Sequence, residues 1–136
     1  MVVSQNNLSS DIGRDILNMG GNAVDAAVAV GFSLATTLPR AGNLGGGGFM
    51  LVYIKERNEV FFIDYRSSSP LNSNIKDIFN KKLPRDYKRT NFDLVKKGYK
   101  APAVPGSVAG LLDAHSEFGR LPLEKILEPV IKQAEE

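Results

Sequence analysis

Four consecutive glycines, Gly45 to Gly48, stand directly before an unbroken apolar run at residues 49–54. A charged turn follows at residues 55–59, and a second β-rich run starts at Val60. Two such runs joined by a polar turn predict a β-hairpin. The first run is almost wholly apolar, which predicts burial on both faces. The glycines predict backbone with φ > 0 or a close approach by another segment.

The second β-rich run ends in Asp64-Tyr65-Arg66, just before a Ser-Ser-Ser-Pro break. An arginine fixed at a strand end suits bidentate capture of a carboxylate or a phosphate. A structural salt bridge is the alternative, and the pattern does not separate the two. Asp64 alternates with Arg66 along the strand, where it can orient the arginine.

Helical patterns flank this hairpin on both sides. Ser9 and Ser10 offer caps for a first helix, which Gly20-Gly21 should end. Asn22 can cap a second helix over residues 23–38, with Asp25 completing a weak analogue of a capping box. That helix is apolar nearly all round, which is typical of a buried helix.

Two further helices are predicted near the C-terminal end. Ser107 should cap a third helix that ends near Gly119, and Pro122 suits the first position of a fourth. Residues 75–79 suggest a short helical turn, and residues 80–100 a polar surface loop. About four helices and one hairpin indicate an α/β (α+β) fold.

Composition narrows the function classes. The 136 residues suffice for one domain, and a net charge of +2 gives no support for nucleic-acid or membrane-surface binding. The chain has no cysteine and one histidine, which argues against disulfides and a zinc site. We therefore expect no metal and no cofactor. No apolar run is long enough for a membrane span, and the first residues lack signal-peptide features.

Three motifs have a chemical and a structural reading. Residues 42–48 could bind a phosphate through their backbone N–H groups, but they match neither the dinucleotide fingerprint nor the P-loop. The structural alternative is a tight connection between a helix and a strand. Residues 105–110 look like a nucleophile elbow around Ser107, without the required glycines; a helix cap is the alternative. His115 has no aligned serine or cysteine in the sequence that would make it a catalytic base.

Taken together and in order, these segments resemble the N-terminal part of the large subunit of the γ-glutamyltransferases (γ-glutamyltranspeptidases, glutathione hydrolases). The resemblance runs over nearly the whole chain. The matching segments are GGNAVDAAVA at 20–29, AGNLGGGGFM at 41–50, DYR at 64–66, VPGSVAG at 104–110 and LPL at 121–123.

The resemblance implies an N-terminal-nucleophile hydrolase with an αββα sandwich, of which residues 1–136 would be an incomplete part. In that family a precursor cuts itself, and the new N-terminal threonine of the small subunit attacks γ-glutamyl amides such as glutathione. Water or an amine then accepts the acyl group. No segment here matches the threonine, so we expect no catalytic residue in this chain and no activity from the chain alone.

By the same resemblance, Arg66 binds the α-carboxylate of the γ-glutamyl substrate. Asp64 and Gly45 to Gly48 are interpreted as structural support, and alanine at Gly46 or Gly47 is expected to disturb maturation. The resemblance also implies that the partner of this chain is the small subunit of the same precursor. Members of the family are commonly periplasmic or extracellular. Ser67 departs from the family, which usually has glutamate there. A related amidohydrolase or acylase, or a non-catalytic remnant of the fold, are the alternatives.

Overall fold

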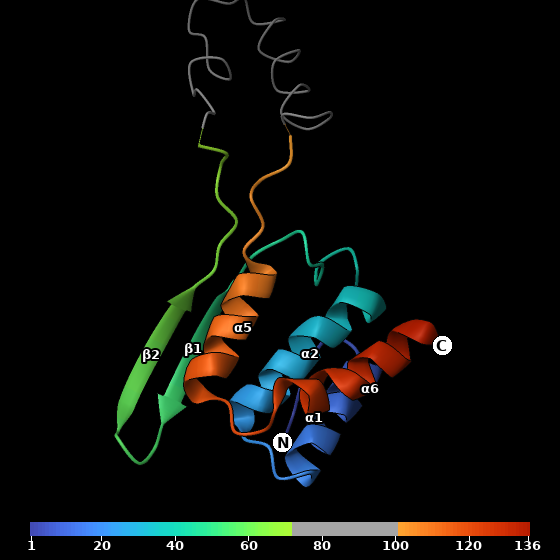
Figure 1. Cartoon of the computed structure of the whole chain (residues 1–136), viewed down its shortest axis with the longest axis vertical. Helices are drawn as coiled ribbons and strands as arrows, with labels where there is room; N and C mark the ends of the chain where they lie inside the picture. The colour runs from blue at the N-terminus through green and yellow to red at the C-terminus, as the bar shows by residue number, and fades with distance from the viewer. Residues whose placement is uncertain (72–100) are drawn as a thin grey trace, which may run out of the picture. The chain divides into compact units, whose positions relative to one another are not determined.

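The computed structural model describes residues 1–71 and 101–136. It divides the chain into one unit of Met1–Ser67 with Pro105–Glu136, and a second of Ser68–Val104. The described residues form four helices and one antiparallel β-hairpin, which confirms the predicted α/β class. The expectations for residues 75–79 and 80–100 lie outside the described residues. The elements, shown in Figure 1, are α1 (Asn7–Asn18), α2 (Ala23–Thr37), β1 (Phe49–Ile54), β2 (Glu59–Asp64), α5 (Ser107–Phe118) and α6 (Leu123–Glu135).

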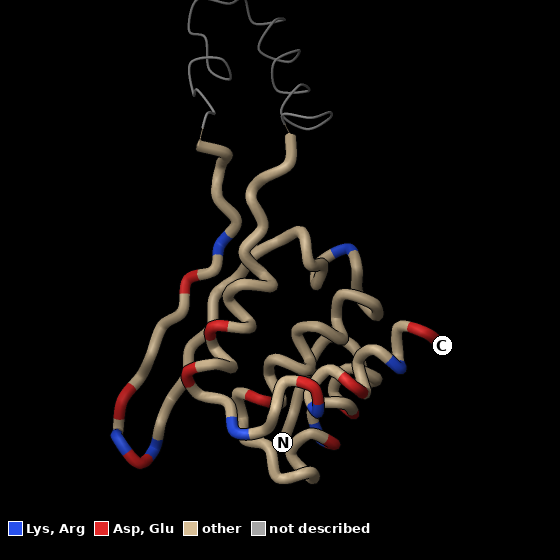
Figure 2. Tube along the Cα trace, viewed as in Figure 1, with Lys and Arg blue, Asp and Glu red and all other residues tan. Residues whose placement is uncertain are grey.

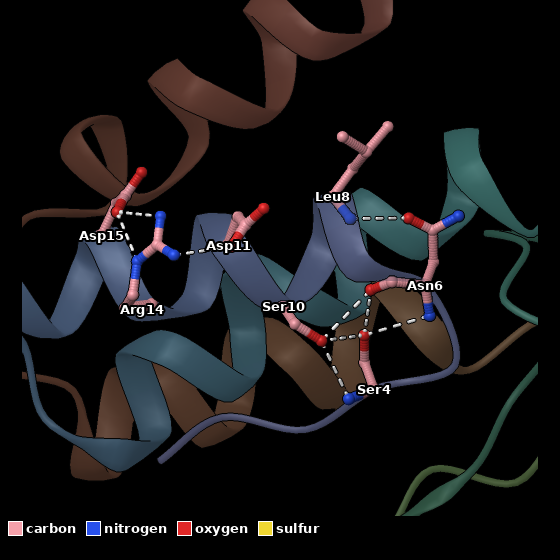
Figure 3. A network of polar contacts seen from close by, with 7 residues as sticks. All are labelled: Ser4, Asn6, Leu8, Ser10, Asp11, Arg14 and Asp15. Atoms are coloured by element: carbon pink, nitrogen blue, oxygen red, sulfur yellow. Dashed lines mark hydrogen bonds and ion pairs between the residues drawn. The ribbon is translucent and has the colours of Figure 1, made fainter.

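Helix α1 begins earlier than the sequence predicted, because Asn6 is its cap. The Asn6 side chain accepts the backbone N–H of Leu8 at 2.9 Å. The predicted caps at Ser9 and Ser10 are therefore wrong: both serines lie inside the helix. Ser10 instead bonds through its hydroxyl to the backbone N–H and the hydroxyl of Ser4, at 3.0 and 2.8 Å (Figure 3). This contact holds the N-terminal segment against α1.

The end of α1 follows the prediction. Gly20 adopts φ 92°, a left-handed conformation that a glycine takes without steric cost. The N–H of Gly20 donates to the Leu17 carbonyl and the N–H of Gly21 to the Ile16 carbonyl, each at 3.0 Å. These two bonds make a Schellman motif, which satisfies the last carbonyls of the helix.

Helix α2 is the centre of the helical part. Asn22 accepts the N–H groups of Val24 and Asp25, and Asp25 accepts the N–H of Asn22, so the predicted capping box is present. The helix packs against α1, α5 and α6, which explains why it is apolar on nearly every side. The buried apolar cluster is Ile12, Ile16, Val24, Ala26, Val28, Ala29, Val52, Leu111, Ala114, Ile126 and Val130.

A buried hydroxyl cluster adds a polar contact among three helices. The Ser33 hydroxyl, on α2, lies 2.7 Å from the Ser9 hydroxyl on α1 and 2.6 Å from the Gln133 side-chain oxygen on α6. Ser9 and Ser33 are fully buried. Buried hydroxyls need partners of this kind, so the cluster restricts how the three helices can be arranged.

The hairpin has one covered face and one exposed face. Its register pairs Phe49 with Asp64 and Leu51 with Phe62. On the inner face, the ring of Phe61 packs on Phe118 of α5 with centroids 4.9 Å apart. The predicted burial of β1 on both faces is wrong for this chain, since every second residue is exposed. We call this exposed surface the outer face; its apolar residues are Phe49, Leu51, Tyr53, Val60 and Phe62.

Figure 1 shows α5 between the hairpin and α2. The predicted cap at Ser107 is wrong, because Ser107 is the first residue of α5 and Gly106 precedes it as a cap without a side chain. Pro122 stands one position before α6, and that helix continues through Pro129. In Figure 2, charges of both signs gather at the hairpin turn, the predicted polar turn.

Within the second unit, Ser68 and Val104 form an isolated antiparallel bridge, with N–H to carbonyl distances of 3.1 and 2.8 Å. None of the helices in the described parts of the chain is long and apolar enough to cross a membrane.

Candidate functional site

The candidate site lies where β2 ends. Arg66 is two residues beyond the last strand residue, Asp64, and both side chains are exposed. The Asp64 carboxylate accepts the backbone N–H of Arg66 at 2.9 Å. Asp64 therefore supports the arginine through its main chain, and the contact resembles a short turn that a side-chain carboxylate closes.

The guanidinium of Arg66 has no ion pair within the described residues, where no carboxylate lies within 4.0 Å of it. It lies 5.9 Å from the ring centroid of Phe49, which in turn stacks on Phe62 at 5.7 Å. The salt-bridge reading thus finds no partner in this part of the protein. A guanidinium over an aromatic ring keeps its donors free for a planar anion.

The β-ladder continues beyond the strands into the glycine run. Gly48 and Tyr65 exchange both backbone hydrogen bonds, at 3.1 and 3.3 Å. A Cβ at Gly47 would lie 2.8 Å from the Arg66 carbonyl carbon and would overlap the backbone of Tyr65 and Ser67. Gly47 thus allows the main chain around Arg66 to approach closely. Close approach by another segment was one of the two predictions that the sequence made for the glycine run.

The other reading, backbone with φ > 0, is wrong for Gly45 to Gly48. Among the glycines of the described residues, Gly20 has a positive φ and none of these four does. The four also differ in their surroundings, because a Cβ at Gly45 or Gly46 would meet nothing closer than 3.4 Å. Close approach therefore applies to Gly47 and Gly48.

Gly46 contributes through its carbonyl. That oxygen accepts the N–H groups of Gly106 and Ser107, at 2.8 and 3.1 Å, and so caps α5 in place of a side chain. The N–H groups of Gly46 and Gly48 donate to carbonyls of Asn43 and Tyr65. These internal bonds favour the helix-to-strand connection over a phosphate cradle, which needs free N–H groups.

Tyr65 is the residue of this site that the sequence reasoning did not single out. Its ring lies against Gly48, where a Cβ would come within 2.9 Å of the ring edge. Cβ atoms at Gly106 and Gly110 would overlap its carbonyl oxygen and its side chain. The sequence feature that could have indicated this contact is the pair Gly106 and Gly110. Residues four apart lie on the same side of a helix, and these two leave that side without side chains. Burial raises the pKa of the Tyr65 phenol above its ordinary value.

Ser107 and His115 do not form a catalytic pair. The Ser107 hydroxyl donates to the Asn43 carbonyl at 3.3 Å. His115 lies eight residues further along α5, roughly 12 Å away along the helix axis. Its Nε2 lies 2.8 Å from the Leu121 carbonyl and 3.8 Å from the carboxylate of Asp25. Both residues thus have structural partners, and the nucleophile-elbow reading is not supported.

Comparisons with known proteins agree with the arrangement of these segments. A family profile described as "Gamma-glutamyltranspeptidase" matches residues 9–136. The "Glutathione hydrolase proenzyme" of Escherichia coli (strain K12) is 43% identical over 98% of this chain and 22% of its own length. The protein of the same name from Pseudomonas aeruginosa is 42% identical over 98% of this chain and 23% of its own length. This chain thus spans less than a quarter of either relative.

The fold is also similar to a solved enzyme of this kind. The crystal structure of the Helicobacter pylori gamma-glutamyltranspeptidase superposes with a TM-score of 0.84 at 37% identity. The superposition covers 97% of this chain and 36% of the other. Family profile, sequence identity and fold give the same assignment. The chain belongs to the gamma-glutamyltranspeptidase family.

Proposed function

We propose that this chain forms the N-terminal part of the large subunit of a γ-glutamyltransferase that cleaves γ-glutamyl amides such as glutathione. Support comes from the curated relatives, whose names give both the substrate and a proenzyme. In this proposal a second subunit from the same precursor supplies the threonine nucleophile. An αββα sandwich would then form when further elements of the protein complete the hairpin and the helices described above.

The single observation that carries the proposal is the exposed guanidinium of Arg66 just beyond the end of β2, which has no ion pair among residues 1–71 and 101–136. A γ-glutamyl group carries its α-carboxylate several bonds from the amide that is cleaved. A guanidinium that binds this carboxylate through two hydrogen bonds also fixes the distance to the amide. Arg66 therefore acts in binding and orientation, and the acyl transfer to water or an amine occurs on groups outside this chain.

The test uses the full-length protein and γ-glutamyl-p-nitroanilide. Arg66→Ala should raise KM by about 10- to 100-fold, the loss expected for hydrogen bonds to a charged group. Arg66→Lys should recover part of that loss, because an ammonium cannot make the planar two-point contact. Arg57→Ala, in the turn at the other end of the same hairpin, is the matched control. An unchanged KM in Arg66→Ala would refute the proposal.

Ser67 motivates a second candidate function. The family usually has an acidic residue at this position, and its absence alters how a substrate ammonium can be met. A related acylase would prefer amides without an α-ammonium group. Comparing γ-glutamyl-p-nitroanilide with glutaryl-p-nitroanilide, which lacks that group, separates the two: a higher kcat/KM for the glutaryl compound favours the acylase. Ser67→Glu should then shift the preference back toward the γ-glutamyl donor.

A further inference from the structure

Tyr65 connects Arg66 to the helical part of the molecule. Neighbouring residues of a strand point to opposite faces, and here Tyr65 is half-buried while Arg66 is exposed. The main chain of Tyr65 exchanges two hydrogen bonds with Gly48. The backbone that carries Arg66 is therefore anchored on one side by the tyrosine.

Three glycines from two distant segments leave room for this one tyrosine. A Cβ at Gly110, on α5, would overlap the Tyr65 side chain and lie 2.5 Å from Cδ1. A Cβ at Gly106 would overlap the Tyr65 carbonyl oxygen, and one at Gly48 would lie 2.9 Å from Cε2. We call this arrangement the glycine slot; it consists of Gly48, Gly106 and Gly110. Because these residues have no side chain, the ring and the main chain of Tyr65 lie directly against the first turn of α5, the residue before it and the residue before β1.

On its own face, Arg66 has few contacts with the described residues. Its backbone N–H donates to Asp64, and its guanidinium lies 5.9 Å from the Phe49 ring centroid. No other side chain in the described ranges forms an ion pair or hydrogen bond with the guanidinium. The direction of the Arg66 side chain thus depends chiefly on how its main chain is held.

We infer that Tyr65 is a positioning residue: its ring, seated in the glycine slot, fixes the main chain at residues 65–67 and thereby aims Arg66 at the substrate carboxylate. The inference rests on the proposed function of Arg66. It assigns the effect to the ring and not to the hydroxyl, which makes no hydrogen bond to any residue that the structure describes. A side chain that aims a ligand group acts mainly on substrate binding, because small misplacements weaken a two-point contact.

The test is a double-mutant cycle in the full-length enzyme, with KM and kcat for γ-glutamyl-p-nitroanilide and the melting temperature as readouts. The variants are Tyr65→Phe, Tyr65→Ala, Arg66→Ala and the double variant of Tyr65→Ala with Arg66→Ala. Phe61→Ala is the matched control, since Phe61 lies on the same face of β2 and packs on Phe118 of α5. Tyr65→Leu replaces Tyr65→Ala where the alanine variant does not mature.

We expect Tyr65→Phe to keep the wild-type KM, and Tyr65→Ala to raise it about 10-fold with kcat changed less than about twofold. In the Arg66→Ala background, Tyr65→Ala should add almost nothing, because residues that act as one unit are not additive. Phe61→Ala should lower the melting temperature without raising KM.

The outcomes distinguish the two proposals. Equal KM factors for Tyr65→Ala with and without Arg66 overturn the positioning role and leave the function of Arg66 standing. A raised KM in Tyr65→Phe also overturns it, because the hydroxyl would then be required. An unchanged KM in Arg66→Ala removes the proposed function, and the inference with it.

Discussion

The carboxylate of Asp25 accepts the backbone N–H of Arg120 through both oxygens, at 3.0 and 3.1 Å, although 95 positions separate the two residues. The same carboxylate accepts the N–H of Leu121 at 3.3 Å and caps its own helix through Asn22. Asp25 is fully buried. One side chain thus joins the start of α2 to the connection between α5 and α6, and it fixes the helix that forms one wall of the glycine slot.

Asp25→Ala should destabilise the full-length protein by about 2–4 kcal/mol, because it removes a fully buried carboxylate and leaves the partly buried N–H groups of Asn22, Arg120 and Leu121 without that acceptor. The melting temperature before and after the change measures this. Asp15→Ala is the matched control: Asp15 pairs with Arg14 on the surface of α1, where both side chains are more than half exposed. A surface pair of this kind contributes about 0–1 kcal/mol. Equal melting temperatures for the two variants would contradict the structural role of Asp25.

Alanine substitutions should separate the glycines of the run. Gly47→Ala places a methyl group onto the main chain of Tyr65 and Ser67, and we expect it to cost about 1–3 kcal/mol and to impair maturation. At Gly45 and Gly46 an added methyl group meets no atom closer than 3.4 Å, so Gly45→Ala and Gly46→Ala should behave like the wild type. This corrects the expectation from the sequence that alanine at Gly46 disturbs maturation. Melting temperature and the yield of processed subunits test this. Loss of maturation in Gly45→Ala, with Gly47→Ala unaffected, would contradict the assignment.

Local features could be predicted from the sequence because the residues that make them are neighbours. The capping box of Asn22 and Asp25 and the end of α1 at Gly20-Gly21 depend on a few consecutive residues, and both were predicted. The hairpin followed for the same reason. The predicted caps at Ser9 and Ser10 were wrong, although serine is a common capping residue. Asn6 caps the helix one turn earlier, and the Ser9 side chain lies in the buried hydroxyl cluster.

Long-range contacts could not be predicted in this way. The glycine run predicted a close approach by another segment. The neighbouring sequence does not indicate that this segment is the main chain around Arg66. The contact between Gly110 and Tyr65 joins segments far apart in the sequence, so the ring position was missed. The apolar run of β1 predicted two buried faces, whereas helices of this chain cover one. An apolar pattern predicts that a face of the strand is buried, but it does not identify the segment that buries it.

The raised pKa of Tyr65 predicts a loss of stability at alkaline pH. The folded protein holds this phenol proton more tightly than the unfolded chain, whose tyrosines titrate near a pKa of about 10. The stability that Tyr65 contributes is therefore fully present below pH about 10 and is lost as the pH rises through the raised pKa. Tyr65→Phe cannot ionise, so its melting temperature should fall less between about pH 9 and 11.

The matched control is Tyr53→Phe, which removes a phenol hydroxyl from the outer face of the hairpin, where the tyrosine is 59% exposed. It measures what the loss of a tyrosine hydroxyl by itself does to the melting temperature. If Tyr65→Phe and the wild type lose stability in parallel over the alkaline range, the phenol is not buried in the manner described.

The outer face of the hairpin predicts how residues 1–136 behave when they are produced alone. Five apolar side chains, on two paired strands, are each more than half exposed there. A contiguous apolar surface of this kind promotes association, and strand edges add unpaired backbone groups. We therefore expect the isolated chain to form soluble or insoluble associates. Because the proposed function assigns the nucleophile to a second subunit, we also expect this chain to release no p-nitroaniline from γ-glutamyl-p-nitroanilide above a mock preparation.

Replacing two facing residues of the outer face, Leu51→Thr with Phe62→Thr, should lower the associated fraction, because threonine keeps a high strand propensity while it reduces the apolar area. Size-exclusion chromatography with light scattering measures the change. Val108→Thr is the matched control: Val108 is an exposed apolar residue on α5, outside the hairpin, and its replacement should leave the association unaltered. If Val108→Thr reduces association as much as the hairpin pair does, the outer face is not what brings the chains together. A monodisperse wild-type chain would refute the prediction directly.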